Sequence, residues 1–153
     1  MRILSYDLLM ILLARGFFGL FLATVLGFGS WAIIRDSVPT PDSDSASFFL
    51  VHAAMAGGPA ALGAALAWWN TESSGRAHLL AVFLTMGITV MSTWLVFEIW
   101  EVETYNALFG GVYRIPVIST SDMLTKMMTA AVVSANAVAA TFYLYRALRY
   151  RDF

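Results

Sequence analysis

Ionisable residues within or beside long apolar stretches are the first candidates for chemistry in this chain, because a charge at membrane depth is costly unless it is paired or hydrated. His52 lies about one helical turn inside one apolar stretch, and Glu98 lies a similar distance from the end of the next. Glu101 follows on the same helical face as Glu98, and Asp122 directly precedes a further apolar stretch. We therefore expect these four side chains to face one another at one end of a helical bundle.

One imidazole and several carboxylates around a common cavity have three chemical uses. They could bind a divalent metal ion, pass protons, or orient the carbonyl of a quinone. A haem held by His52 with a methionine such as Met123 or Met127 is a further arrangement that these residue types permit. The competing interpretation is a structural cluster, in which the carboxylates pair with Lys126 or Arg114. The sequence requires none of these cofactors, and the identity of any metal or ligand stays unknown.

His78 and Arg15 lie toward the opposite end of the apolar stretches from His52. The two histidines cannot ligate one haem, because much of a hydrocarbon core about 30 Å thick would separate them. We expect His78 to be a solvated residue at a helix start. Arg15 lies inside its stretch, where a long side chain can extend to the headgroups. Its functional alternatives are pairing with an anionic substrate, with a lipid phosphate or with Asp7.

The elements that must position these side chains follow from composition. The chain has 153 residues, of which 59% are hydrophobic and 12% are charged, against a globular average of about 25% charged. Four apolar stretches are each long enough to cross a hydrocarbon core that needs about 20 helical residues, namely 8–34, 47–69, 78–100 and 123–148. No connection between them could form a soluble domain of about 50 residues. The sequence predicts an all-α, integral membrane four-helix bundle, with 1–153 as one transmembrane domain.

The segment 101–122 is long for a connection between bundle helices, which usually takes about 2 to 8 residues. We expect a loop here. Apolar side chains such as Tyr105 and Phe109 predict that this loop lies on the membrane interface or folds over the helix ends. Gly110 and Gly111 indicate a turn within it.

The charges divide unevenly between the two sides that alternating spans define. Six of the nine Lys and Arg residues fall on the side that holds both termini, and most carboxylates fall on the other. Because Lys and Arg accumulate on the cytoplasmic side, we expect both termini in the cytoplasm and a location in the plasma (inner) membrane. His52 and the carboxylates near it would then face outward. The six basic residues are Arg2, Arg15, Arg76, Arg146, Arg149 and Arg151.

Small residues are expected to hold the helices together, since apolar burial contributes little to helix association in lipid. The second stretch is rich in Ala and Gly, and Gly19 and Gly27 form a matching row in the first. Pro59 lacks a backbone donor and should bend its helix. Asn136 is a lone amide at mid-membrane, which could specify a partner helix or contact a ligand. The expected packing residues are Gly19, Gly27, Gly57, Gly58, Pro59 and Asn136.

Composition also excludes several classes of function. A net charge of −1 provides no basic field for nucleic acid. The chain has no cysteine, which excludes disulfides, thiolate metal sites, iron–sulfur clusters and covalently attached haem. No catalytic motif is recognisable, so an enzyme is the less favoured class.

Several short motifs together resemble the DoxX-like family of small four-helix membrane proteins. They are Leu12-Leu13-Ala14-Arg15-Gly16, Gly57-Gly58, Arg76 and Leu124-Thr125-Lys126. His52, Pro59 and the long segment 101–122 depart from the family pattern. The resemblance implies an accessory or quinone-linked membrane subunit that associates with sulfur or thiol redox partners. Without cysteine, this chain could not itself exchange thiols.

Two functional hypotheses follow. The first is a non-catalytic accessory or anchoring subunit of a respiratory or redox membrane complex, with the lipid bilayer and other membrane subunits, or a second copy of the chain, as its partners. Small-residue helix faces and the lack of room for a soluble domain motivate it. The alternative is an outward-facing site for a metal ion, a quinone or protons, built on His52, Glu98, Glu101 and Asp122.

Overall fold

The computed structural model describes residues 6–34, 46–69, 75–109 and 120–149, and each segment forms one helix. Along the chain these are α1 (Tyr6–Ile34), α2 (Ala46–Ala67), α3 (Gly75–Phe109) and α4 (Thr120–Arg149). Each is long and apolar enough to cross a membrane, which confirms the predicted all-α fold with four candidate spans and indicates a multi-pass membrane protein. Only the backbone is described for Asp7, 46–49, 96–109, 120–124 and 147–149.

The helices begin and end near the predicted bounds, except where α3 ends. The sequence predicts an end at Trp100, but α3 continues to Phe109. Residues 101–109 contain no Gly or Pro and include good helix formers, so the helix continues as far as the residue before Gly110. Since α4 already starts at Thr120, the predicted loop 101–122 is helical at both of its ends. Its middle, 110–119, lies outside the described residues.

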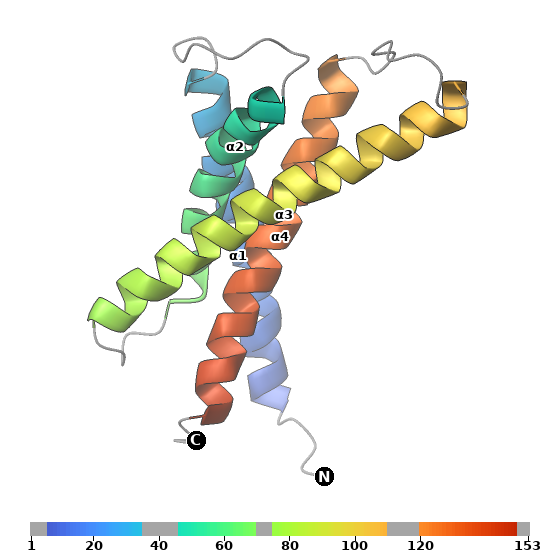
Figure 1. The fold of residues 1–153 in the computed structure, drawn as a ribbon. Helices are drawn as coiled ribbons and strands as arrows, with labels where there is room; N and C mark the ends of the chain where they lie inside the picture. Colours follow the sequence, from blue (N-terminus) through green and yellow to red (C-terminus); the bar gives the residue numbers. More distant parts are fainter. Residues whose placement is uncertain (1–5, 35–45, 70–74, 110–119, 150–153) are drawn as a thin grey trace.

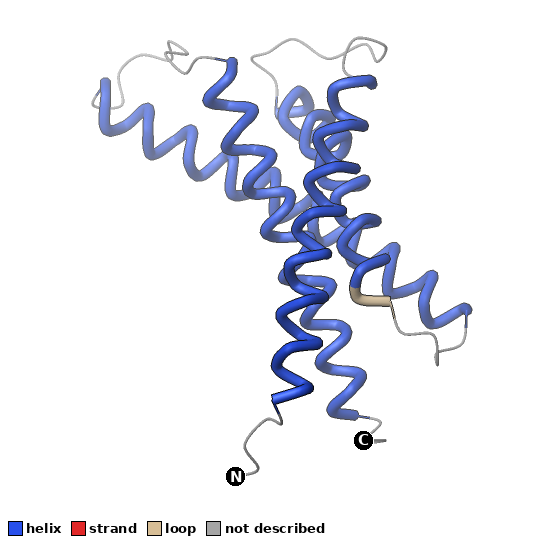
Figure 2. Tube along the Cα trace, turned by 180° about the vertical axis from the view of Figure 1, so that it is seen from behind, coloured by secondary structure: helices blue, strands red, loops and turns tan. Residues whose placement is uncertain are grey.

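The longest helix, α3, leans across the others. Its 35 residues span about 52 Å at 1.5 Å per residue, which exceeds a hydrocarbon thickness of about 30 Å. Figure 1 shows α3 crossing α4 obliquely, and in Figure 2 the same crossing is seen from behind. In both views the C-terminal end of α3 extends away from the start of α2. The start of α1 and the end of α4 lie together at the opposite end of the molecule (Figure 1), which we call the terminal end.

The core is organised around α2. More than half of its span is buried, at 56%, whereas the spans of α1, α3 and α4 are 11%, 22% and 28% buried. Within the described residues α2 and α4 each contact all three other helices, while α1 and α3 do not touch each other. Small side chains allow this central position because they let neighbouring backbones approach closely. The buried alanines of α2 are Ala53, Ala56, Ala60, Ala61 and Ala64.

Glycines mark the closest contact between α1 and α2. A Cβ atom on Gly27 would lie 3.0 Å from Ala60 Cβ and 3.1 Å from Ala56 O. A Cβ atom on Gly63 would lie 2.6 Å from Leu22 O, which is too close for any real side chain. At these two positions the helices therefore pack backbone against backbone.

The buried face of α3 is polar and its exposed face is apolar. Thr85, Thr89 and Thr93 are buried on one face, and Thr85 Oγ1 donates to Ala81 O while Thr93 Oγ1 donates to Thr89 O, each at 2.7 Å. Such local bonds satisfy hydroxyls that have no water available. This reversal of the soluble pattern is what a lipid environment favours. The large apolar residues exposed on α3 are Leu79, Leu80, Phe83, Leu84, Ile88, Met91 and Leu95.

Candidate functional site

Aromatic, amide and basic side chains from all four helical segments meet at the terminal end of the bundle. One comes from α1, two from the residues that follow α2, one from α3 and three from α4. We call this group the polar junction. Its members are Arg15, Trp68, Trp69, His78, Asn136, Tyr143 and Arg146.

The polar junction is built on the last turn of α2. Helical hydrogen bonding continues through Trp68, whose N donates to Ala64 O at 3.1 Å, and the chain then tightens, because Trp69 N donates to Leu66 O, three residues back, at 3.3 Å. Arg15 Nη1 then donates to Trp69 O at 3.3 Å. A cation is favoured at this place, since the C-terminal end of a helix carries partial negative charge on its unpaired carbonyls. Arg15 thereby joins α1 to the end of α2.

Arg15 also contacts α4 through Tyr143. Its guanidinium carbon lies 4.7 Å from the centre of the Tyr143 ring, and Trp68 packs on the same ring with centroids 5.5 Å apart. A cation–π contact at an exposed site contributes about 0.5–1 kcal/mol. The sequence predicts that Arg15 extends to the headgroups or binds an anion, and the structure adds partners within the chain itself.

Asn136 connects three helices at once. Its Oδ1 accepts a hydrogen bond from Trp68 Nε1 at 2.8 Å, and its Nδ2 donates to Gly16 O at 3.3 Å. The amide therefore links α4 to the end of α2 and to α1. Gly19 leaves the space for it, because a Cβ atom there would overlap with Asn136 Oδ1 and lie 3.1 Å from Trp68 Nε1. In a low-dielectric interior such satisfied polar bonds specify one arrangement of the helices.

His78 is not the solvated residue that the sequence predicts. Only 6% of its surface is exposed, because the Trp69 ring stacks on the imidazole with centroids 3.9 Å apart and planes inclined by 28°. The prediction assumes that a residue in the first turn of α3 is exposed, which holds only if no other part of the chain covers that turn. The indole that follows α2 provides this cover.

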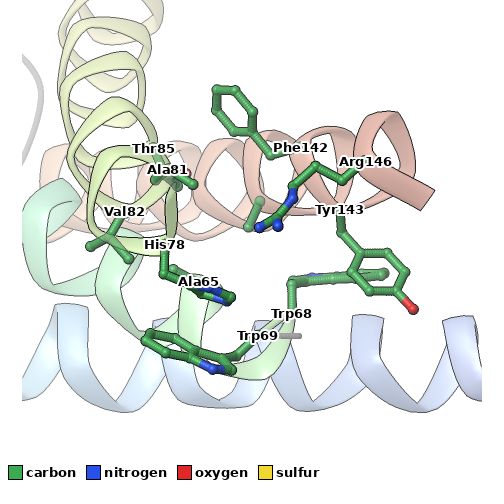
Figure 3. A pocket seen from close by; sticks show the side chains of 11 residues that line it. Ala65, Trp68, Trp69, His78, Ala81, Val82, Thr85, Phe142, Tyr143 and Arg146 are labelled. Carbon is green, nitrogen blue, oxygen red and sulfur yellow. The ribbon is translucent and has the colours of Figure 1, made fainter. Parts of the chain in front are cut away.

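A cavity of about 50 Å³ opens beside the polar junction, between the end of α2, the start of α3 and the end of α4. Figure 3 shows His78 at its border and the guanidinium of Arg146 pointing from α4 toward it. Trp68, Trp69 and Tyr143 supply aromatic walls. The cavity is well below the range of about 300–1,000 Å³ in which metabolite-sized ligands bind.

The four residues of the predicted outward site lie at the other end of the bundle. His52 is buried in α2, at 7% exposure, whereas Glu98 and Glu101 belong to α3 and Asp122 to the first turn of α4. The side chains of the three carboxylates lie outside the described residues, and among described side chains no group of three or more His, Asp or Glu could hold a metal. A metal, quinone or proton site at this end stays a prediction.

An apolar groove of about 510 Å³ runs between α1 and α4 in this same half of the bundle. Its two α1 residues lie in the second half of that helix, and its α4 residues follow the start of that helix. The groove is lined by Thr24, Phe28, Thr125, Met128, Thr129, Val132 and Val133.

Gly57 and Gly58, two further residues predicted to serve in packing, lie where α2 meets α3. A Cβ atom on Gly57 would lie 3.4 Å from both Thr93 Oγ1 and Val90 Cα, and one on Gly58 would lie 3.7 Å from Met86 Cε. Helix α2 is continuous through Pro59. A side chain as small as that of alanine would therefore make only ordinary van der Waals contact with α3 at either glycine.

Comparison of the chain with protein-family models, with curated proteins and with solved structures gives no match. The resemblance to the DoxX-like family therefore stays a prediction.

Proposed function

We propose that this chain is a non-catalytic accessory or anchoring subunit of a larger membrane complex, of the respiratory or redox kind. We place it in the plasma (inner) membrane with both termini in the cytoplasm, on the charge distribution described above. Its partners are the lipid bilayer and another membrane protein or a second copy of the chain.

The exposed face of α3 is the observation that carries this proposal. Leu80, Leu84 and Met91 lie on one side of the helix and are 61%, 44% and 49% exposed. Gly87 lies among them, and a Cβ atom on it would meet nothing within 4 Å. An apolar helix face with a notch at a small residue is the kind of surface against which another membrane helix packs.

The polar junction supports the same proposal. Asn136 and Trp68 use their polar atoms to hold helices together, and Arg15 closes the end of α2. The cavity beside them has room for a few small groups but not for a metabolite. These features suit a rigid scaffold whose function depends on what packs against it.

Photo-crosslinking in native membranes tests this proposal. A photoreactive amino acid replaces Met91 on α3 or, as the control, Phe17 on α1, which is 77% exposed on a helix that does not touch α3 within the described residues. We expect a discrete protein adduct from position 91 and lipid adducts from position 17. Lipid adducts alone at both positions, with a lone species of 16.8 kDa on blue-native electrophoresis, would contradict the proposal.

The alternative proposal is an outward-facing metal, quinone or proton site on His52, Glu98, Glu101 and Asp122. Burial of the His52 imidazole, an ionisable group inside an apolar span, favours it. The test measures bound metal, bound quinone and visible absorbance of purified His52→Gln protein. His78→Gln is the matched control, since His78 is equally buried at the other end. Loss of a bound species in the first variant alone supports the site; metal-free, quinone-free and colourless wild-type protein excludes its metal and quinone forms.

A further inference from the structure

We propose that the cavity beside the polar junction is a binding site for a phosphate group, carried by a lipid headgroup or present as inorganic phosphate. Arg146 and His78 are the two side chains that would hold it. Both line the cavity, and Figure 3 shows them approaching it from α4 and α3.

Arg146 is the main evidence for an anion. Its guanidinium points toward the cavity, and it forms no hydrogen bond, ion pair or ring contact with another described residue. The side chain is half-buried at the end of an apolar helix, so its charge is only partly hydrated and an anion in the cavity would stabilise it. Its planar fork of donors matches phosphate oxygens, which it can bind in bidentate fashion.

The surroundings of the cavity carry further positive charge. His78 lies in the first turn of α3, where unpaired backbone N–H groups and the helix dipole favour an anion. Arg15 lies against Tyr143, which also lines the cavity, and its bond to Trp69 O covers the carbonyl end of α2. No carboxylate side chain of the described residues lines the cavity.

The size of the cavity matches a single phosphate group. A water molecule needs about 10–15 Å³ of such space, so 50 Å³ has room for about three to five small atoms or waters. A phosphate group has five heavy atoms, whereas a nucleotide, a quinone ring or a sugar is much larger.

The position of the cavity also suits a headgroup. Trp68 directly follows Ala67, the last residue of α2. His78 lies in the first turn of α3, and Arg146 lies in the last turn of α4. All three residues are therefore at the ends of apolar spans. Trp and Tyr side chains collect at the depth of lipid headgroups, where one end of the ring is apolar and the other polar. A lipid phosphate at this depth could enter from the side of the bundle.

The experiment uses the full chain in alkyl maltoside micelles, which contain no phosphate. Phosphatidylglycerol is added in one arm and diacylglycerol with the same acyl chains in its control; inorganic phosphate is added in a second arm, against chloride at equal ionic strength. Bound phosphorus after gel filtration and the thermal unfolding midpoint are measured. The site variant is Arg146→Gln, and the matched control is Arg76→Gln, an exposed arginine of α3 at the same end but outside the cavity.

We expect phosphatidylglycerol, but not diacylglycerol, to bind and to raise the unfolding midpoint of wild type and of Arg76→Gln. The apparent affinity should fall by about ten- to a hundredfold in Arg146→Gln, as is typical when charge-assisted hydrogen bonds are lost. A response to phosphatidylglycerol alone assigns the phosphate to a lipid, and a response to both compounds assigns the site to phosphate itself. If Arg146→Gln does not fold, Arg146→Lys decides: weaker binding supports the site, and unchanged binding overturns it.

Two results would overturn the proposal. Equal binding by wild type, Arg146→Gln and Arg76→Gln would mean that the lipid acts only through general surface charge. No response of wild type to either phosphate compound would mean that the cavity does not bind phosphate.

Discussion

Replacing Gly63 by Ala tests the close approach of α1 and α2. A Cβ atom there would lie 2.6 Å from Leu22 O and 2.9 Å from Ala23 N, which are both backbone atoms. Ordinary contact begins near 3.4 Å, so α1 would have to retreat by about 0.8 Å, the difference between 3.4 and 2.6 Å. A gap of about 0.5–1 Å already forfeits a quarter to a half of the dispersion attraction between facing atoms. We expect Gly63→Ala to lower the free energy of unfolding by about 1–3 kcal/mol, the usual range for overpacking.

Gly87→Ala is the matched control for this prediction. A Cβ atom on Gly87 would meet nothing within 4 Å, and Ala brings the same gain in helix propensity, about 0.5–1 kcal/mol, at both positions. Unfolding would be followed by circular dichroism in mixed micelles, with a denaturing detergent as the titrant. We expect Gly63→Ala to unfold earlier than wild type, and Gly87→Ala to unfold at the same point or later. Equal stability of the two variants would refute the backbone contact between α1 and α2.

Three further predictions concern hydrogen bonds and orientation. Thr89 Oγ1 is buried and has no hydrogen-bond partner among the described residues, so Thr89→Val should raise the free energy of unfolding by about 1 kcal/mol. Thr85→Val is the control: it loses the hydrogen bond to Ala81 O and should show no gain in stability in the same titration. Trp68→Phe removes the donor to Asn136 and should lower the free energy of unfolding by about 1–2 kcal/mol; an unchanged unfolding curve would mean that this bond contributes nothing. Because the chain has no cysteine, single cysteines at Asp42 and Arg151 should react selectively with a membrane-impermeant maleimide: position 42 in intact cells, position 151 only after lysis. The reverse pattern would invert the proposed orientation.

The four helices could be predicted from the sequence because each is marked by a long apolar stretch, and this signal is local. The end of α3 shows the limit of that signal. Hydropathy falls at Glu98, Glu101 and Glu103, which predicts the end of a span, but a helix can continue beyond the span until it meets a residue that breaks it. The span and the helix are different objects, and only the first is read from hydropathy.

The polar junction could not be predicted from the sequence, because it depends on contacts between residues that are far apart in the chain. Arg15 and Asn136 stand out singly as polar residues in apolar stretches, yet nothing local indicates that Trp68 bonds to Asn136 or that Trp69 covers His78. One signal was available: Arg15, Trp68 and His78 all lie at the same end of their helices. Counting depth from the helix ends would have grouped them, although not their bonds.

The Ala and Gly composition of α2 has a consequence for how this protein tolerates mutation. In the core of a soluble protein, a destabilising substitution usually replaces a large side chain by a smaller one and leaves a cavity. Ala60, Ala64 and Gly63 have almost no side chain to truncate, and all three are buried. Nearly every single substitution along this strip enlarges the residue, so harmful variants here should push helices apart, and only a compensating reduction on the opposing helix could restore the fit.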